Sequence, residues 1–579
     1  MPLASSVFTL LVALNAAPQS PDSLDRVIRR EMDKRGIPGL SIAVIDSGRI
    51  VLSRAYGVTK RGTTTPVTTG TLFLAGSISK AVTAVGAMRL VERGTLQLDR
   101  DVNEQLVSWK VPDTTVAAGE KLTVRELLSH SAGLNVHGFP GYALTAPFPT
   151  LVQVLDGAKP ANTQAIRIVQ RPGVRWEYSG GGYTILQQLM IDVTHQPFDE
   201  YMMREVLTPA GMMASTFAQP LPASYAPNAA TGHTDDGAPV PSGWHAYPEM
   251  AAAGLWTTPT DLAKFAMSLQ RAFHRDNATF LSADRADQML SYQRNDFMGL
   301  GVFLRGNNVR LEFSHGGRDE GFDASMTATA LTGQGVVIMI NANDNSAAVE
   351  RIQRTVAHMY NWPNYQKDPV PPHALTADAS ALIDVAGRYE VRPNQMVTFA
   401  PRDGHLYSYA DGHEDEEFVP VGPDRFTRVD GDATFQFNRD AARHVIGTTE
   451  IDQGGERTIS RVGPLVTAMA LARDPDASRT KRIETLLKAM AAGKASDQAV
   501  LLTAGALRDF RDHVVGDLVG VANVTYVGEE DVSDRGLNRH NGADAKIVYV
   551  KALIGGRSRY VLVHLRKDGV ITDYDVVVR

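Results

Sequence analysis

The stretch Ser77-Ile78-Ser79-Lys80 constrains the fold most, because it opens a helix that has to enter the protein core. The apolar run behind it ends at Gly94 and contains five residues at helical spacing: Ala81, Ala84, Val85, Met88 and Val91. A spacing of three places Ser77 and Lys80 on one helix face, with Cβ atoms roughly 5–6 Å apart. Burial of this lysine lowers its pKa, so the amine can accept a proton. The pattern predicts a nucleophile with its base; the alternative is a capping serine and a lysine that reaches solvent.

Composition excludes several classes of function. The 579 residues carry a formal net charge of −6, so we expect no nucleic-acid partner. Cysteine is absent, which excludes disulfides, thiolate zinc sites and cysteine nucleophiles. The motifs Gly-x-Ser-x-Gly, His-Glu-x-x-His and Gly-x-x-x-x-Gly-Lys are also absent. An α/β-hydrolase, a zinc protease and a nucleotide-dependent enzyme are therefore poor fits.

The N-terminus resembles an export signal. Within residues 1–20, the apolar run Val7 to Ala13 precedes the small residues Asn15-Ala16-Ala17-Pro18, although no Lys or Arg occurs before Arg26. We expect a signal peptide and a periplasmic or secreted protein; the alternative is a plain N-terminal extension. No later stretch approaches the ~18 apolar residues of a membrane span, so we expect none.

The order of helix and strand signals predicts an α+β domain over residues 21–365. A helix over Ser23–Arg35 and a hairpin over residues 40–56 precede a mostly helical insert, and a helix over Ala347–Tyr360 ends the domain. Strands at both ends of the insert predict one antiparallel sheet flanked by helices, plus a helical subdomain. The strand-like runs after the insert are Met298–Leu304, Val309–Phe313, Ala324–Leu331 and Val336–Asn341.

Two smaller domains are predicted to follow. Residues 366–375 are Pro-rich and predict a stiff linker. Short alternating runs over residues 376–472 predict a small β-sandwich or barrel, and residues 476–579 predict an α+β unit whose helices cover Arg479–Ala492 and Ala499–Phe510. We expect this third domain to mediate self-association or to cover the cleft.

Two later stretches carry further chemistry. In one, Tyr178 precedes the glycines 180–182 and a helix predicted over Ile185–Thr194. In the other, His315-Gly316-Gly317-Arg318 ends a predicted strand, where small residues let the backbone approach a ligand. A serine helix, a tyrosine loop and a glycine-bearing strand together predict three walls of one site.

With these motifs in this order, the sequence resembles the serine β-lactamase and penicillin-binding-protein family. It is most similar to the branch that holds class-C-like β-lactamases, D-alanyl-D-alanine carboxypeptidases, D-aminopeptidases and β-lactamase-fold esterases. The resemblance covers residues 23–360, and the later domains resemble a lipocalin-like β module and a cystatin-like α+β module. The motifs that carry it are Ser77-Ile78-Ser79-Lys80, Leu127–Leu134, Pro172–Ser179, Gly254–Leu262 and His315-Gly316-Gly317.

The resemblance implies a role for each site residue. Ser77 attacks a carbonyl and forms an acyl-enzyme, while Lys80 and Tyr178 share the proton transfers. The neighbouring ammonium is expected to lower the pKa of Tyr178. The backbone N–H groups of Ser77 and Arg318 form the implied oxyanion hole. The resemblance implies no cofactor and no metal.

Two departures bear on the substrate. Gly180 stands where many relatives have the Asn of Tyr-x-Asn, and His315 stands where most penicillin-binding proteins have Lys. Both changes favour an ester or a small amide over a β-lactam or a peptide, although Arg318 could still supply a cation. We expect His315, Gly317, Arg318 and Gly180 to contact the substrate.

Other conspicuous residues receive a structural interpretation. His130 is expected to be a satisfied helix-end residue rather than a catalyst. Trp176 and Trp256 either border the cleft or pack in the core. The acidic run His413–Glu417 is expected to be a solvated face rather than a metal site.

These observations predict a cofactor-independent serine hydrolase that acts through an acyl-enzyme on a carboxylic ester or a D-amino-acid amide or peptide. The alternatives are a D-alanyl-D-alanine carboxypeptidase or weak β-lactamase and, from another class, an inactive cell-envelope binding or scaffold protein. The expected partner is a small-molecule or short-peptide substrate. Its identity depends on loops such as Phe139–Pro149 and Pro220–Pro248, whose shape the sequence does not predict. The sequence leaves the oligomeric state open.

Overall fold

The structure, a computed structural model, describes most of the chain. The described ranges are 21–112, 121–234, 237–276, 280–343, 345–365, 377–392, 395–409, 416–429, 433–452, 455–465, 472–510, 515, 518–533, 538–539 and 542–577. The expected signal (1–20), the expected linker (366–375) and His413–Asp415 lie outside these ranges. No helix within them is long and apolar enough to cross a membrane.

One six-stranded antiparallel sheet organises the first domain. Its hairpin β1 (Gly39–Asp46) and β2 (Arg49–Gly57) pairs with β10 (Gly335–Ile340), where Ile42 lies opposite Ile338. The strand order β2-β1-β10-β9-β8-β7 joins the two ends of the domain, as predicted. The remaining strands are β9 (Phe322–Thr329), β8 (Glu312–Asp319) and β7 (Phe303–Arg305).

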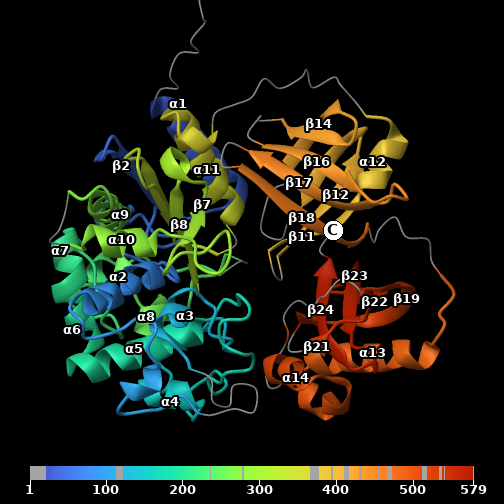
Figure 1. Ribbon diagram of the computed structural model, residues 1–579, viewed down its shortest axis with the longest axis horizontal. Coiled ribbons are helices and arrows are strands. Elements are labelled where there is room, and N and C mark those ends of the chain that lie inside the picture. Colours follow the sequence, from blue (N-terminus) through green and yellow to red (C-terminus); the bar gives the residue numbers. More distant parts are fainter. Residues whose placement is uncertain are drawn as a thin grey trace, which may run out of the picture.

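Helices cover both faces of this sheet (Figure 1). The helices α1 (Pro21–Arg35) and α11 (Ser346–Met359) pack on one face, where Ile42 and Val44 are buried. The opposite face, with Ala43 and Ile45, shares a second buried cluster with α2 (Ile78–Glu92) and α9 (Pro259–Phe273). Because both faces are buried, β1 is a continuous apolar run rather than an alternating one.

The helical insert forms a subdomain beside α2. Its helix α5 packs against α2, α3 and α8, which brings segments far apart in the chain to the serine helix. Its α-helices are α3 (Val124–Leu128), α4 (Leu151–Asp156), α5 (Gly180–Thr194), α6 (Phe198–Met202), α7 (Thr208–Ala210) and α8 (Met250–Ala253), and α10 (Ala283–Met289) follows α9. Short strands β3 (Phe73–Leu74), β4 (Tyr142–Ala143), β5 (His245–Ala246) and β6 (Trp256–Thr257) link its loops in pairs.

Two predicted strands are wrong in extent. Of the first run, Met298–Leu304, only Phe303 and Leu304 belong to the sheet strand β7, because Gly301 adopts a left-handed φ of 82° and turns the chain against α2. The second run, Val309–Phe313, joins the sheet only from Glu312, because Asn308 just before it has a left-handed φ of 50° and Asn308–Arg310 forms a 3-10 turn. The predicted helix over Ile185–Thr194 starts earlier, at Gly180, because Ser179 caps it by accepting the Gly182 N–H at 3.2 Å.

The second domain is a closed eight-stranded antiparallel barrel, so the barrel alternative holds. Its interior is filled by aromatic rings, with Phe399 in edge-to-face contact with Tyr389, Phe418, Phe435 and Phe437. The helix α12 (Ala379–Val385) packs on β12. The strands are β11 (Gly387–Arg392), β12 (Gln395–Arg402), β13 (His405–Tyr409), β14 (Glu416–Gly422), β15 (Arg425–Arg428), β16 (Ala433–Arg439), β17 (Val445–Asp452) and β18 (Gly455–Pro464).

The third domain packs helices on a four-stranded antiparallel sheet. Its strand order is β19-β22-β23-β24, and α13 (Ala477–Ala491) lies on β19. The helix predicted over Ala499–Phe510 is instead a 3-10 segment, Ala495–Leu501, followed by α14 (Ala504–Phe510). The strands are β19 (Ala522–Asp531), β22 (Lys546–Ile554), β23 (Arg557–Leu565) and β24 (Ile571–Val577), beside a small pair, β20 (Asn538–Arg539) and β21 (Gly542–Ala543).

Ion pairs connect the domains. Arg305 on the edge strand β7 pairs with Asp452 of the barrel. The Arg354 guanidinium on α11 lies 2.9 Å from the Glu416 carboxylate on β14. Arg388 on β11 lies 3.1 Å from Asp575 on β24. The barrel therefore contacts both the sheet edge of the first domain and the third domain.

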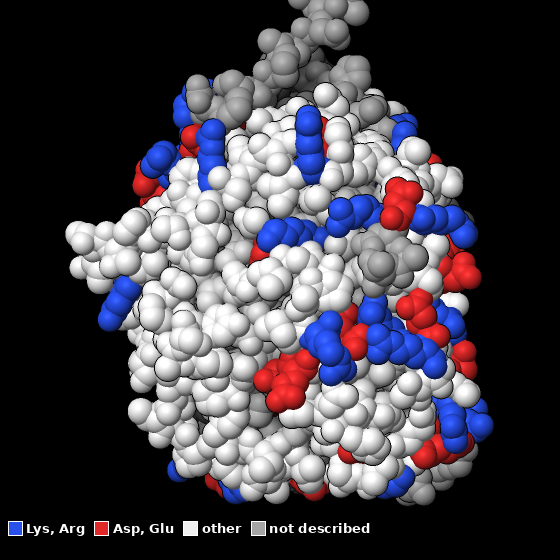
Figure 2. Space-filling model, turned by 90° about the vertical axis from the view of Figure 1, so that its left-hand side faces the viewer, with Lys and Arg blue, Asp and Glu red and all other residues white. Residues whose placement is uncertain are grey.

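Charges are mixed on the face of the molecule that Figure 2 shows. Blue and red side chains lie next to one another there, and a broad area carries neither. Among the residues drawn in colour, this face presents no continuous basic surface of the kind that binds a polyanion.

The close approach of Gly301 to α2 generates a prediction about stability. A Cβ at Gly301 would lie 2.3 Å from the Ala84 Cβ, whereas a Cβ at the left-handed Gly94 would meet nothing within 4 Å. Both Gly→Ala changes carry the same backbone penalty of about 1–2 kcal/mol. We expect Gly301→Ala to lower the free energy of unfolding by about 1–3 kcal/mol more than Gly94→Ala, because only the former overpacks the core. Urea unfolding measures the free energy of unfolding of both variants. An equal loss in the two would contradict the close packing of Gly301 against Ala84.

Candidate active site

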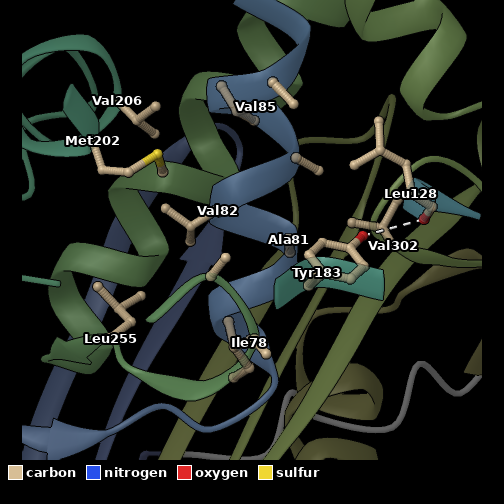
Figure 3. Packing of buried hydrophobic residues seen from close by; sticks show 14 of the residues in the cluster. Ile78, Ala81, Val82, Val85, Leu128, Tyr183, Met202, Val206, Leu255 and Val302 are labelled. Atoms are coloured by element: carbon tan, nitrogen blue, oxygen red, sulfur yellow. Dashed lines mark hydrogen bonds between the residues drawn. The ribbon is translucent and has the colours of Figure 1, made fainter. Parts of the chain in front are cut away.

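Ser77 stands at the N-terminus of a helix buried almost all round. It is the N-cap of α2 and makes no capping side-chain hydrogen bond, so its hydroxyl is available for chemistry. Figure 3 shows Ile78, Ala81, Val82 and Val85 of this helix packed among side chains of the surrounding elements. A serine on such a helix has a fixed position relative to the core.

Lys80 is buried beside Ser77. Its Nζ donates hydrogen bonds to Ser77 Oγ at 2.9 Å and to the carbonyl oxygen of Ala252 on α8 at 2.8 Å, and the residue is 2% exposed. Burial lowers the pKa of Lys80 to about 7, against the opposing effect of the Asp319 carboxyl. A substantial share of Lys80 is therefore neutral near pH 7 and can accept the hydroxyl proton.

Tyr178 also reaches the nucleophile, but its ionisation differs from the expectation. Its side chain hydrogen-bonds that of Ser77, and its ring centroid lies 5.0 Å from Lys80 Nζ. Burial raises the pKa of Tyr178 above its ordinary value, and the Ser77 hydrogen bond lowers it by less. The expectation of a lowered pKa is wrong, because desolvation of the phenolate is the largest effect and Asp319 acts in the same direction. Tyr178 is a phenol that can donate a proton, which leaves Lys80 as the better base.

The strand β8 meets the turn before Ser77 at very short range. A Cβ at Gly317 would lie 1.9 Å from the carbonyl oxygen of Ala75, and a Cβ at Gly76 would lie 2.4 Å from the backbone N of Arg318. Gly76 also has a left-handed φ of 51°. Both positions therefore require glycine. The backbone N of Arg318 thus lies beside the residue that precedes Ser77, close to the other backbone N–H expected in the oxyanion hole.

His315 lies on the same strand but is enclosed. Its Nδ1 is 2.7 Å from the Gly316 carbonyl oxygen, and its ring packs 5.4 Å from Phe303 and 6.3 Å from Tyr178. Burial and the charge of Lys80 lower the pKa of His315 to about 3. The ring is therefore neutral at physiological pH and cannot replace a lysine as a fixed positive charge.

A cavity of about 400 Å³ opens at the nucleophile. Of the four residues predicted to contact substrate, Arg318 lines it; His315, Gly317 and Gly180 are not among the described lining residues. The described lining residues are Ser77, Lys80, Gly138, Phe139, Pro140, Thr234, Ala253, Arg318, Asp319, Glu320 and Asn343.

Phe139 occupies the space next to Gly180. A Cβ at Gly180 would lie 2.8 Å from the Phe139 ring and 3.0 Å from the carbonyl oxygen of His137. The volume that an amide side chain would need is thus filled by an aromatic ring that also reaches the cavity.

Sequence analysis missed Asp319 as a site residue. It is 4% exposed, lines the cavity, and accepts the Gly76 N–H at 3.1 Å. Burial raises the pKa of Asp319 well above its usual value, although Lys80 opposes this. Alternation along the strand was the available signal, because residues 315, 317 and 319 share one face of β8.

The other conspicuous residues are now placed. Trp256 is fully buried and packs against Trp244 and Phe322, which assigns it to the core. Trp176 packs 5.1 Å from Phe297 and is not among the described residues that line the cavity. Over the described ranges, no three His, Asp or Glu residues are grouped so that they could hold a metal ion.

The lowered pKa of Lys80 predicts the pH dependence of acylation. With the neutral amine as the expected base, kcat/KM for an uncharged ester should rise with pH and level off above about 7. Lys80→Arg, which stays protonated, should lose roughly 10²- to 10⁴-fold in kcat/KM at every pH. Steady-state rates between pH 5 and pH 9 measure this, and a profile that stays flat through neutrality would contradict the assignment.

Comparisons with known proteins agree with this geometry. A profile of the family described as Beta-lactamase matches residues 24–359. The "Putative penicillin-binding protein PbpX" of Bacillus subtilis (strain 168) is 23% identical over 322 residues, which make up 55% of this chain and 74% of that protein. "Protein flp" of Staphylococcus aureus (strain N315) is 27% identical over 206 residues, 34% of this chain and 39% of that protein.

A solved structure shares the fold. The octameric penicillin-binding protein homologue from Pyrococcus abyssi aligns with a TM-score of 0.50 and 22% identity, over 76% of this chain and 100% of that one. This share is larger than residues 24–359 make up, so the likeness extends beyond the first domain. The family profile spans more than half of the sequence and includes the serine helix, the tyrosine loop and β8. The chain therefore belongs to the beta-lactamase family.

Proposed function

We propose that this protein is a serine hydrolase that forms an acyl-enzyme on Ser77 and cleaves carboxylic esters or aminoacyl amides. The observation that carries the proposal is the 2.9 Å hydrogen bond between Lys80 Nζ and Ser77 Oγ at the wall of a cavity. The lysine in this pair is buried and has a pKa of about 7. A serine and a base with these properties are what nucleophilic acyl transfer needs.

The acylation step follows from the protonation states. Neutral Lys80 takes the hydroxyl proton as Ser77 Oγ bonds to the substrate carbonyl carbon, and the carbonyl oxygen becomes an oxyanion. The backbone N–H groups of Ser77 and Arg318 stabilise that charge. When the intermediate collapses, the bond to the leaving group breaks, Tyr178 gives its proton to that group, and the Lys80 ammonium reprotonates Tyr178.

Deacylation repeats these steps with water. Lys80 accepts a proton from the water that attacks the ester carbonyl, and the bond to Ser77 Oγ breaks as that oxygen regains a proton. The carboxylic acid leaves, and both Lys80 and Ser77 return to their starting states.

The charges around the cavity favour substrates without a carboxylate. The neutral His315 offers no cation, and Arg318 Nε lies 3.2 Å from the Asp323 carboxylate, which offsets its charge. The acidic side chain of the half-buried Glu320 also lines the cavity, and so does Asp319, a carboxyl whose pKa burial raises well above its usual value. An acyl group that is neutral or carries an amine therefore fits this electrostatic environment better than an anionic one.

A matched substrate series tests this preference. We expect p-nitrophenyl acetate and the p-nitrophenyl ester of an amino acid with a free amine to be hydrolysed, and p-nitrophenyl hemisuccinate to show at least a roughly 10-fold lower kcat/KM. Glu320→Gln should reduce the ratio of kcat/KM for the amine-bearing ester to kcat/KM for the succinyl ester. Preference for the succinyl ester, or labelling of Ser77 by a fluorescent penicillin, would favour the carboxypeptidase or β-lactamase alternative.

A covalent probe separates an active site from an inactive one. A fluorophosphonate should form a covalent adduct with the wild-type protein but not with the Ser77→Ala variant, as measured by intact-mass spectrometry. Ser77→Ala should also abolish ester turnover while its thermal midpoint stays close to that of the wild type. A wild-type protein that takes no adduct would contradict the proposal and favour the binding or scaffold alternative.

A further inference from the structure

His130 packs directly on the tyrosine of the candidate site. Its ring centroid lies 4.2 Å from that of Tyr178 with the planes inclined by 33°, and the residue is 1% exposed. The ring centroid of Tyr183, at the start of α5, lies 5.4 Å from that of His130. His130 is not among the described residues that line the cavity. Among the residues proposed for catalysis, Tyr178 is the one on which the His130 ring packs.

His130 also holds the backbone on both sides of Tyr178. The Glu177 N–H donates to the His130 carbonyl oxygen at 2.8 Å, and the Ser179 N–H donates to His130 Nδ1 at 3.1 Å. One residue thus satisfies the donors immediately before and after the tyrosine. Since these bonds join a loop end to a segment almost fifty positions later, they fix the backbone from which the phenol extends.

The ring is suited to this role because it is neutral. Burial, with the charges of Lys80 and His315, lowers the pKa of His130 well below its usual value. In a neutral imidazole whose Nδ1 accepts a hydrogen bond, the proton resides on Nε2. His130 thus offers the Ser179 N–H an acceptor without placing a second positive charge beside Lys80.

The backbone of His130 gives an independent reason to ascribe a role to its side chain. Its φ is 55°, in the left-handed region that favours glycine. A residue with a Cβ costs about 1–2 kcal/mol there. Glycine would relieve that strain but would lose both the Nδ1 acceptor and the ring against Tyr178. Strain of this kind, kept in place by its surroundings, often accompanies a functional site.

We propose that His130 is a positioning residue that keeps the Tyr178 hydroxyl in hydrogen-bonding contact with Ser77. The inference rests on the proposed function and extends it, since the sequence assigned His130 only to the end of a helix. It corrects that expectation in one respect. The residue is buried, but its Nε2 has no hydrogen-bond partner among the described residues, so it is not fully satisfied as expected. The contacts that it does make are to the two neighbours of a proton donor rather than to the helix itself.

The test compares three variants of His130. His130→Asn keeps a side-chain acceptor and tolerates the left-handed φ. His130→Gly relieves the backbone strain but has no side-chain acceptor. His130→Leu has no side-chain acceptor and does not relieve the strain. We expect Gly and Leu to lower kcat for an ester substrate by roughly 10- to 100-fold with KM changed less than about threefold, and Asn to keep most of the activity. A merely structural role would instead make activity follow stability, so that the Gly variant would be the most active of the three.

A double-mutant cycle shows whether the effect passes through the tyrosine. In a Tyr178→Phe background, which lacks the phenol hydroxyl, adding His130→Leu should lower kcat by a further factor of less than about three. His195 is a matched control, because it has a left-handed φ of 54° but is exposed at the end of α5. His195→Gly and His195→Leu should leave kcat unchanged.

The outcomes separate the inference from the function on which it rests. The same variants are compared by their rate of covalent labelling at Ser77 with a fluorophosphonate probe. If the wild-type protein is labelled and His130→Leu is labelled equally fast, or if its loss of kcat persists undiminished in the Tyr178→Phe background, the inference is overturned and the function stands. If the wild-type protein takes no label and turns over no ester, both are overturned.

Discussion

The chemistry proposed for this molecule depends on the burial of one amine. Lys80 lies within a closely packed helix interface, where an ammonium ion loses most of its hydration and only a few hydrogen bonds replace it. The carbonyl oxygen of Ala252 and the hydroxyl of Ser77 are enough to hold the amine in place but not to keep it fully charged. The same burial keeps Tyr178 and His315 neutral. One desolvated site therefore holds the proposed base, the proposed proton donor and an uncharged ring together.

The backbone geometry around this amine depends on contacts that a single methyl group would prevent. Gly317 on β8 approaches Ala75, and Gly76 approaches Arg318, so the sheet and the serine helix meet without intervening side chains. The sheet in turn is assembled from both ends of the domain, since β1 pairs with β10. Formation of the site is thus coupled to completion of the whole first domain, and the helical insert between its strands supplies Tyr178.

Much of this could be predicted from sequence, because local periodicity and motif order carry it. The buried helix after Ser77, the sheet from two chain ends and the later β domain, predicted as a sandwich or a barrel, all follow from patterns that repeat over many residues. What failed depends on tertiary distances. The pKa of Tyr178 depends on how deeply the side chain is buried. The predicted strand starts only at residue 303 because of the left-handed turn at Gly301. The contacts of His130 with residues near 178 likewise required the folded chain.

The ring of Phe139 beside Gly180 has a consequence for how such a site can change over evolution. Because the ring already fills the space next to Gly180, a substitution that restores an amide side chain there collides with Phe139, and a smaller residue at 139 alone leaves a void. Each single step is therefore disfavoured, while the two together conserve volume. The exchange of the aromatic ring for an amide at this site therefore requires coordinated changes at two positions that lie forty-one residues apart in the chain.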